Sequence, residues 1–351
     1  MSLRIITLLI LTVTLYLLPA VAAPDNYATV FIFHRFGDQR YPSTSVPMRD
    51  FEKEMKYLKT HNYNVISVKK LYDIVSSGKP IPPKTVVITI DDGYETTMKA
   101  FKILKKYKFP FTVFLYTAAI NRYPDFLTLK QIKEMEESGL VTFGNHLYDH
   151  PNLGWKRLHL PKDKYVKLLK REERKSRKRF KRLLGYEPEF LAFPYGDYDK
   201  ISLKFFRNRY KLLFSQDRGA FSGREFPVPR MAVVGSQSGF KLFVEDLNIE
   251  PLPVVKHTPD IGLTDKNPVS VSFEIENPEN YHYCSIYATG VGWLNNVEKK
   301  GNVVKLKDKL TLVKYKTRIG IRCYDKRTGK KAEFFFLVLE KKPGKSPALT
   351  N

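Results

Sequence analysis

Beyond its first two dozen residues, the sequence has no apolar run long enough to span a bilayer, so we expect no transmembrane segment in the mature chain. It also lacks internal repeats and low-complexity segments, apart from a basic C-terminal tail at 341–345. Acidic residues are scarce, because 36 Asp and Glu oppose 60 Lys and Arg, and the formal net charge is +24. Such a charge favours anionic surroundings: nucleic acid, an anionic membrane or an anionic polymer.

The composition provides enough apolar material for a packed core. Hydrophobic residues make up 43% of the 351 residues and charged residues 27%, which excludes wholesale disorder. The length corresponds to one large domain with a smaller one beside it.

The N-terminus has the pattern of an export signal. Arg4 precedes an apolar run at 5–18, and the small residues at 20–22 form a cleavage site. A membrane anchor is the alternative, but the run is shorter than the roughly 20 residues of a spanning helix, Pro19 ends it, and the segment has no Cys to accept a lipid. We therefore expect a signal peptide at 1–22 and a periplasmic or secreted protein. This location excludes nucleic acid as a partner and is compatible with electrostatic association with an anionic envelope surface.

Residues 23–248 are expected to form one α/β domain. Apolar, β-rich runs alternate with helical periodicities between residues 29 and 215, the pattern of a parallel sheet with intervening helices. Seven strands are expected, at 29–33, 65–67, 86–90, 112–116, 141–145, 190–193 and 212–215. This succession predicts a barrel.

Two helices of this domain have clear signals. Thr128 is a candidate N-cap for a helix that Gly139 ends. At 162–182, Lys and Arg greatly outnumber acidic residues, yet weakly apolar residues repeat with helical spacing. We interpret this segment as an outer helix with a solvated basic side; a dedicated polyanion site is the alternative.

After residue 243 the pattern changes to alternating strands without helical periodicity. Residues 250–253 are interpreted as a linker, and 249–345 as a C-terminal β-sandwich, immunoglobulin-like or fibronectin-like. Its strands are expected at 269–275, 283–289, 310–314, 317–324 and 332–339. Cys284 and Cys323 lie on separate expected strands, and in an oxidising compartment such a pair is expected to form a disulfide.

Polar residues follow several of the expected barrel strands at the end where barrels place their active sites. They are His34 after the first strand, Asp91 and Asp92 after the third, 146–150 after the fifth and 194–196 after the sixth. Two adjacent carboxylates at the end of an apolar run are costly to bury without a partner. A cation is the obvious partner.

His146 and His150 are four residues apart, so one helical turn could present both rings to a single ion. Taken alone, they could be two ordinary surface or core histidines. Together with an aspartate they form the ligand set of a catalytic zinc site, which keeps one position open to water. Cobalt, nickel and manganese are the alternative divalent metals.

Three motifs resemble those of the polysaccharide deacetylases, the NodB-homology group also called carbohydrate esterase family 4. They are Thr-Ile-Asp-Asp-Gly at 89–93, His-Leu-Tyr-Asp-His at 146–150 and Phe-Pro-Tyr-Gly at 193–196. The resemblance covers about residues 28–244 and implies a distorted (β/α)7 barrel. It also implies a hydrolase that removes N-acetyl groups from a glycan with the help of a metal.

The resemblance assigns roles residue by residue. It implies Asp92, His146 and His150 as metal ligands and Asp91 as the general base, since a carboxylate that does not bind the cation remains free to take a proton from water. It also implies that a backbone N–H at Tyr195 helps to hold the oxyanion.

Two family features are missing. Ala192 occupies the position of an arginine that orients the base, and no Leu-x-His motif follows residue 212. In both respects the chain is similar to the subgroup that deacetylates poly-β-1,6-N-acetylglucosamine, in which the motif order is permuted. That resemblance implies that His34, after the first strand, is the general acid. The alternative is an ordinary histidine beside the core. Arg230 is a candidate to orient the base, with an exposed basic residue as the alternative.

These observations predict an exported, metal-dependent carbohydrate N-deacetylase that acts on an extracellular or cell-envelope polysaccharide. An O-acetyl esterase on the same metal site is one alternative, because amide and ester hydrolysis both pass through a tetrahedral oxyanion. A catalytically dead glycan-binding protein is another.

Overall fold

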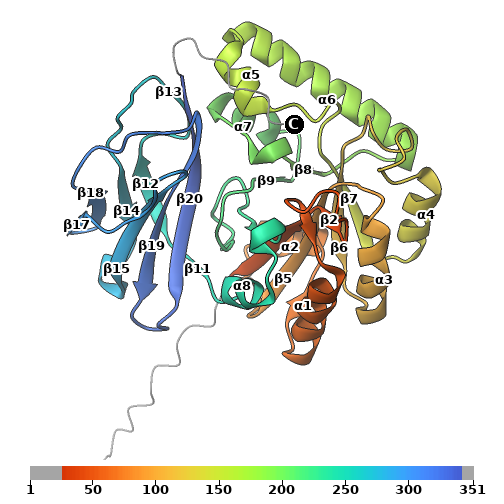
Figure 1. The fold of residues 1–351 in the computed structure, drawn as a ribbon, viewed down its shortest axis with the longest axis horizontal. Helices are drawn as coiled ribbons and strands as arrows, with labels where there is room; N and C mark the ends of the chain where they lie inside the picture. Colours follow the sequence, from red (N-terminus) through yellow and green to blue (C-terminus); the bar gives the residue numbers. More distant parts are fainter. Residues whose placement is uncertain (1–25, 342–351) are drawn as a thin grey trace, which may run out of the picture.

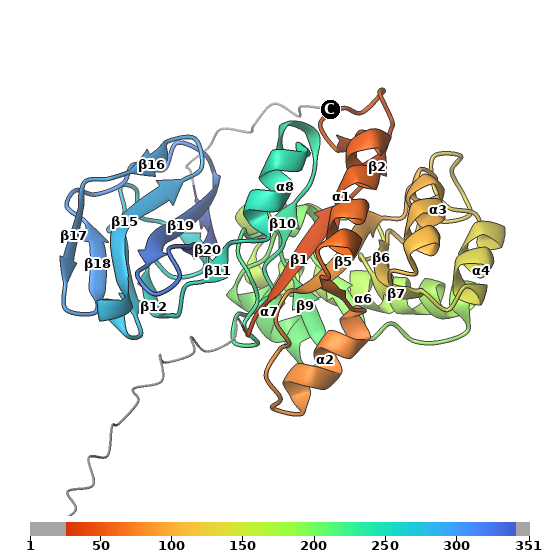
Figure 2. The same ribbon diagram turned by 90° about the horizontal axis from the view of Figure 1, so that it is seen from below.

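The computed structural model describes residues 26–341, so the expected signal peptide at 1–22 and most of the basic tail lie outside the described part. Figures 1 and 2 show an all-β part, drawn in blue, beside an α/β part that runs from red to green. Within residues 26–341, no helix has both the length and the hydrophobicity that a membrane crossing requires.

The α/β part is built on a parallel sheet in the order β10-β1-β5-β6-β7-β8-β9, with β4 paired to β5. The strands are β1 (Ala28–Phe33), β4 (Asn64–Val65), β5 (Thr85–Asp92), β6 (Phe111–Leu115), β7 (Val141–Asn145), β8 (Phe190–Ala192), β9 (Leu212–Phe214) and β10 (Met231–Ala232). Both β1 and β5 are buried along their whole length, which explains their unbroken apolar runs. The sheet curls into a half-barrel covered by helices, which confirms the distorted (β/α) barrel.

One short segment spans the two ends of the curled sheet. Val228 forms a parallel bridge with Phe214 of β9, and three residues later Met231 pairs with Phe31 of β1. Arg230 therefore lies where the last strand comes back towards the first.

The helices of this part are α1 (Met48–Thr60), α2 (Val68–Ser76), α3 (Thr97–Tyr107), α4 (Leu129–Glu137), α5 (Leu153–His159), α6 (Lys162–Leu184), α7 (Lys200–Arg207) and α8 (Phe240–Asp246). Thr128 forms a capping box at the start of α4, as expected. The expected strand at 65–67 was too long, because the Ser67 side chain accepts a hydrogen bond from the Lys70 N–H and caps α2. Short strands β2 (Arg35–Phe36) and β3 (Ser45–Val46) pair with each other.

The all-β part contains two sheets that share one buried core. One has the order β11-β20-β19-β15-β16, with β13 paired to β20, and the other has the order β12-β14-β18-β17. The strands are β11 (Glu250–Pro251), β12 (Val254–Thr258), β13 (Gly262–Thr264), β14 (Ser272–Ile275), β15 (Tyr281–Ala288), β16 (Gly292–Leu294), β17 (Val297–Lys300), β18 (Val303–Leu306), β19 (Lys316–Asp325) and β20 (Lys331–Glu340). A disulfide joins Cys284 of β15 to Cys323 of β19.

Two expectations for this part were wrong. Residues 250–253 are not a free linker, because Glu250 and Pro251 pair with β20 and Leu252 is buried. The segment 310–314 contains no strand, only an isolated bridge between Leu310 and Val269. In both places an apolar residue enters the shared core without the alternating pattern of a strand.

Candidate active site

The register of the parallel strands brings distant polar residues to one edge of the sheet. Asp92 pairs with Leu115, and Leu115 pairs with Asn145, so His146 follows one residue beyond the level of Asp92. On the other side, Phe33 pairs with Ile90, so His34 and Asp91 are the next residues on their strands. The carboxyl ends of parallel strands are where barrels hold their functional residues.

Asp92, His146 and His150 converge on one point. The Nε2 atoms of His146 and His150 lie 3.3 and 3.1 Å from the same Asp92 oxygen, Oδ1. Their ligand atoms all lie within 4.8 Å of one another, and no other group of this kind occurs among the described residues. The Asp92 Oδ1 atom is buried, and no described residue donates a hydrogen bond to it.

A hydrogen bond sets the orientation of the His146 ring. Its Nδ1 lies 2.8 Å from the Ala192 carbonyl oxygen, which can only accept, so Nδ1 carries the proton and Nε2 presents a lone pair. Burial opposes ionisation of Asp92, but the positive charge of the two histidines, when their Nε2 atoms carry protons, outweighs it and holds the pKa of Asp92 well below its ordinary value. A carboxylate oxygen and imidazole nitrogens that share a buried point fit a divalent cation.

The expected helical turn between His146 and His150 was wrong. The segment is a loop in which Leu147 and His150 have φ of 64° and 48°. Side chains capture its N–H groups: Leu147 N–H donates to Asn145 Oδ1 at 3.0 Å, and Asp149 N–H donates to Glu172 Oε2 at 2.8 Å. These bonds replace the backbone bonds of a helix and still direct both rings towards Asp92.

Left-handed backbone is concentrated around this site. Asp92, Leu147, His150 and Tyr195 all have positive φ, between 48° and 70°. Each such conformation costs a non-glycine residue about 1–2 kcal/mol and persists only when the surrounding contacts enforce it. The concentration of strain at one place is typical of a functional site.

Arg230 is buried and holds Asp91 from the opposite side. Its side chain is 0% exposed, so the alternative of an exposed basic residue was wrong. Nη1 and Nη2 donate to Asp91 Oδ1 and Oδ2 at 2.7 and 2.8 Å, and Nε donates to the Ser215 carbonyl at 2.7 Å. Burial opposes ionisation of Asp91, but the Arg230 guanidinium holds the pKa of Asp91 below its ordinary value. Asp91 is therefore an ionised carboxylate with both oxygens oriented.

His34 lies between β1 and β2 at the same edge. It is partly buried, and its Nδ1 has no hydrogen-bond partner among the described residues. Burial lowers the pKa of His34, while Asp92 and Asp91 act in the opposite direction. The His34 ring is thus a neutral imidazole beside two carboxylates. An imidazole of this kind can accept a proton and release it again.

Tyr195 stands on a single 3-10 turn, Pro194–Gly196, directly after β8. Its φ and ψ are 59° and 7°, and its side chain is 44% exposed. Its ring lies 4.6 Å from that of His150, between centroids. The turn therefore borders the three converging side chains.

The sequence did not point to the residues that support the site. Ser215 holds Arg230, Asn145 and Glu172 hold the loop after β7, and Thr117 donates from Oγ1 to the Leu147 carbonyl at 3.1 Å. They come from separate elements and form no motif. Only their burial in the folded chain distinguishes them from ordinary polar residues.

Comparisons with known proteins agree with this geometry. Residues 78–208 match the family model described as polysaccharide deacetylase, a range that includes Asp91, His146 and Tyr195 but not His34 or Arg230. Poly-beta-1,6-N-acetyl-D-glucosamine N-deacetylase of Staphylococcus aureus is 31% identical over 180 residues, which are 49% of this chain and 60% of that protein. The chain thus spans less than two thirds of the length of this relative.

Two solved structures share the fold of the α/β part. IcaB from Ammonifex degensii superposes with a TM-score of 0.55 at 24% identity, over 64% of this chain and 98% of that one. The Streptococcus pyogenes deacetylase PplD in complex with acetate superposes with a TM-score of 0.55 at 22% identity, over 63% and 98%.

Proposed function

We propose that this chain, which carries a polysaccharide deacetylase domain, hydrolyses the N-acetyl groups of N-acetylated amino sugars in an extracellular or cell-envelope polysaccharide. The observation that carries the proposal is the pairing of two neighbouring aspartates with different partners. Asp92 faces two imidazoles, and Asp91 faces a buried arginine. One carboxylate can bind a cation while the other remains available to take a proton.

Asp92, His146 and His150 would hold a divalent metal. Two imidazoles and a carboxylate suit zinc, and cobalt, nickel and manganese accept the same donors. When bound, the cation polarises the acetyl carbonyl and lowers the pKa of water in the site. The protein contributes the donor atoms and the His146 tautomer fixed by the Ala192 carbonyl.

Asp91 would act as the general base. It takes a proton from the attacking water, and Arg230 keeps it ionised and orients both of its oxygens. The backbone N–H of Tyr195 would donate to the oxygen that gains negative charge. His34 would take up a proton before it acts and give that proton to the departing amine, because an amine leaves far more readily than an amide anion. The proton that Asp91 takes from the attacking water would then restore the protonated form of His34.

The relative from Staphylococcus aureus supports one substrate class. Its name states action on poly-β-1,6-N-acetyl-D-glucosamine. We extend this class to the present chain because the shared region is 31% identical over 180 residues. Acetate release by the purified protein from this polymer, from acetylated chitooligosaccharides and from O-acetylated xylan, with and without a chelator, tests the proposal. Release from xylan alone would favour the O-acetyl esterase, and no release would favour a glycan-binding protein.

An anionic surface near the substrate would fit the outer face of α6. The exposed cations of this helix that form no salt bridge within the described residues are Lys162, Lys164, Lys167, Lys170, Arg174, Lys175, Lys178 and Arg182. Of its three acidic residues, Glu172 and Glu173 are buried and face the domain, and Asp163 in the first turn is exposed. We propose that this basic face attaches the exported protein to an anionic envelope surface, an interaction that salt would screen.

A further inference from the structure

The all-β part is joined to the α/β part at the turn that carries Tyr195. Lys316 and Arg318 project from β19 of the all-β part. Lys316 Nζ donates to Asp197 Oδ1 at 2.9 Å, and Arg318 Nε donates to Asp217 Oδ1 at 3.0 Å. Asp197 and Asp217 are buried, so each is a desolvated acid whose partner comes from the other part of the chain.

Arg318 also contacts the backbone of the turn itself. Its Nη2 donates to the carbonyl oxygens of Tyr195 and Gly196 at 3.5 and 3.4 Å, although these residues lie 123 and 122 positions away in the sequence. A Cβ added to Gly196 would lie 2.7 Å from Nη2. The guanidinium therefore packs directly on the turn, and Gly196 leaves the space for it.

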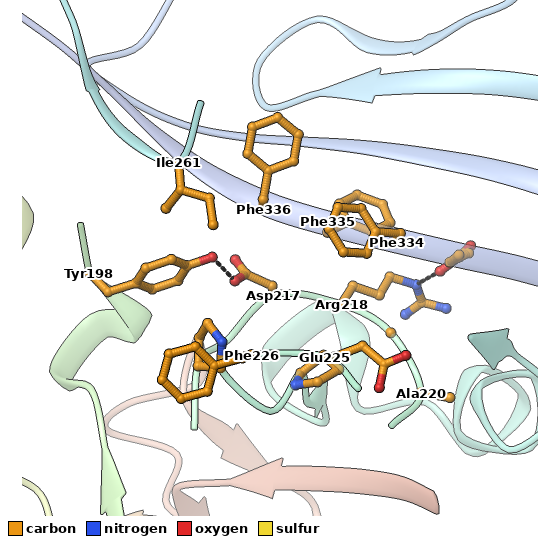
Figure 3. Close-up of a pocket in the computed structure, with 14 residues that line it drawn as sticks. Tyr198, Asp217, Arg218, Ala220, Glu225, Phe226, Ile261, Phe334, Phe335 and Phe336 are labelled. Carbon is orange, nitrogen blue, oxygen red and sulfur yellow. Dashed lines mark hydrogen bonds and ion pairs between the residues drawn. The ribbon is translucent and has the colours of Figure 1, made fainter. Parts of the chain in front are cut away.

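A second set of bonds holds the residues that follow the turn. Tyr198 O–H donates to Asp217 Oδ2, and it accepts from the Leu337 N–H of β20 at 3.3 Å. Figure 3 shows Tyr198 pointing towards Asp217 beneath the strand that carries Phe334, Phe335 and Phe336. The cavity among these residues measures about 30 Å³, far below the roughly 300 Å³ at which ligand pockets begin. This junction is too tightly packed to hold a sugar.

These contacts meet at a turn in a strained conformation. Tyr195 has φ of 59°, and such a conformation persists only when its surroundings enforce it. Within the turn, Gly196 N–H and Asp197 N–H donate to Phe193 and Pro194 carbonyls. The carbonyls of Tyr195 and Gly196 face Arg318 instead.

We propose that Arg318 is a positioning residue and that the all-β part completes the catalytic unit: Arg318 holds the Tyr195 turn in the orientation in which its N–H faces the developing oxyanion. The inference rests on the proposed deacetylase function. This role explains why the all-β part is joined to the barrel at the Tyr195 turn, although none of its described residues belongs to the group formed by Asp92, His146 and His150.

Arg318→Met tests the inference, and Arg322→Met is the matched control. Both arginines lie on β19, with side chains 22% and 21% exposed, and each pairs with a buried acid, Asp217 or Glu333. Only Arg318 contacts the turn. A misplaced N–H donor stabilises the transition state less well. The kcat of Arg318→Met should therefore fall about 10- to 100-fold, with KM within about twofold of wild type.

The hydrolysis rates of amide and activated-ester substrates should fall equally in Arg318→Met, since both reactions form an oxyanion. Arg318→Lys keeps a charge for Asp217 but cannot span both carbonyls, so it should recover the stability and only part of kcat. Full kcat in Arg318→Met, or an equal fall in Arg322→Met, would overturn the inference. If Arg318→Met does not fold, the same comparison is made with Arg318→Lys.

Amide hydrogen exchange provides a measurement that does not depend on turnover. Exchange in the peptide covering residues 193–197 should be faster in Arg318→Met than in wild type, and unchanged in Arg322→Met. A wild-type protein that releases no acetate would refute the proposed function, whereas the exchange result would still decide whether Arg318 holds the turn. Unchanged exchange in Arg318→Met would refute the positioning role.

Discussion

Arg230 and Asp91 form a fully buried, bidentate ion pair across 139 residues of sequence. Neither side chain is exposed, and the guanidinium is held in place by a third bond to the Ser215 carbonyl. The pair keeps one carboxylate ionised within the same site in which a neighbouring carboxylate faces two imidazoles. This division of roles between adjacent residues is the basis of the proposed chemistry.

Substitution of Arg230 should lower the stability of the protein and raise the pKa of the proposed general base, Asp91. Arg230→Met leaves Asp91 buried without its cation, so the free energy of unfolding should fall by about 3–5 kcal/mol. Arg230 lowers the pKa of Asp91, and the base must be ionised to work. Therefore the acidic limb of the pH–kcat profile should move to higher pH in Arg230→Lys, in which the bidentate contact is lost.

Urea unfolding and a pH–rate profile check these two outcomes. An Arg230→Lys variant with a wild-type acidic limb would show that this limb does not report Asp91.

Asp91 and Asp92 should respond differently to the same substitution. Asp91→Asn should retain the metal and lose about 10²- to 10⁴-fold in kcat, the usual contribution of a general base. Asp92→Asn should lose bound metal, because its Oδ1 is the oxygen that both imidazoles face. Metal analysis of the two purified variants, beside acetate release, separates the roles. Loss of metal from Asp91→Asn would make Asp91 a ligand.

His34 should matter more for an amide than for an activated ester. An amine leaving group needs a proton when the tetrahedral intermediate collapses, whereas a good leaving group does not. His34→Ala should therefore retain metal and fold, lose most amide hydrolysis and keep most hydrolysis of an activated acetate ester. Equal losses on the two substrates would exclude His34 as the proton donor.

This pattern also distinguishes His34 from Arg318, because Arg318→Met should reduce both reactions equally.

Glu54 should make stability depend on pH. Both of its carboxyl oxygens are buried on α1 without a hydrogen-bond partner among the described residues, and burial raises the pKa of Glu54 to about 9. Between its ordinary pKa and about 9, the unfolded chain releases this proton and the folded chain keeps it, so this group lowers stability as pH rises, by roughly 1 kcal/mol per pH unit.

Glu54→Gln should flatten the decline in the free energy of unfolding between pH 5 and pH 8, measured by urea unfolding at both values. Glu52→Gln is the control on the same helix, at a side chain that is 50% exposed. A wild-type slope in Glu54→Gln would mean that Glu54 is ionised in the folded protein.

Local sequence was sufficient for the parts of the site that follow apolar strands. Asp91, Asp92 and His146 could be expected at one edge because each stands at the end of an apolar strand, and parallel strands bring such positions together. The separate roles of Asp91 and Asp92 came only from the resemblance to the polysaccharide deacetylases. The conformation between His146 and His150 could not be predicted from their spacing. It depends on Glu172, a residue of α6 whose carboxylate captures the Asp149 N–H.

Residues whose role depends on the return of the chain were harder to predict. Arg230 is buried only because its segment crosses from β9 to β1, a consequence of the whole barrel rather than of its neighbours. Arg318 could not be singled out from the sequence, since an arginine on a strand with alternating residues is ordinary until another part of the chain packs against it. The same holds for Leu252, whose burial against β20 replaced the expected linker.

Acetate release from poly-β-1,6-N-acetylglucosamine, measured with the purified chain and with Asp92→Asn as the matched variant, decides whether this chain is a metal-dependent N-deacetylase. We expect steady release by the wild-type protein, its loss on treatment with a chelator, its return on addition of zinc, and no release by Asp92→Asn with or without zinc. Release by the wild type that persists through chelation, or that Asp92→Asn retains, would contradict this expectation.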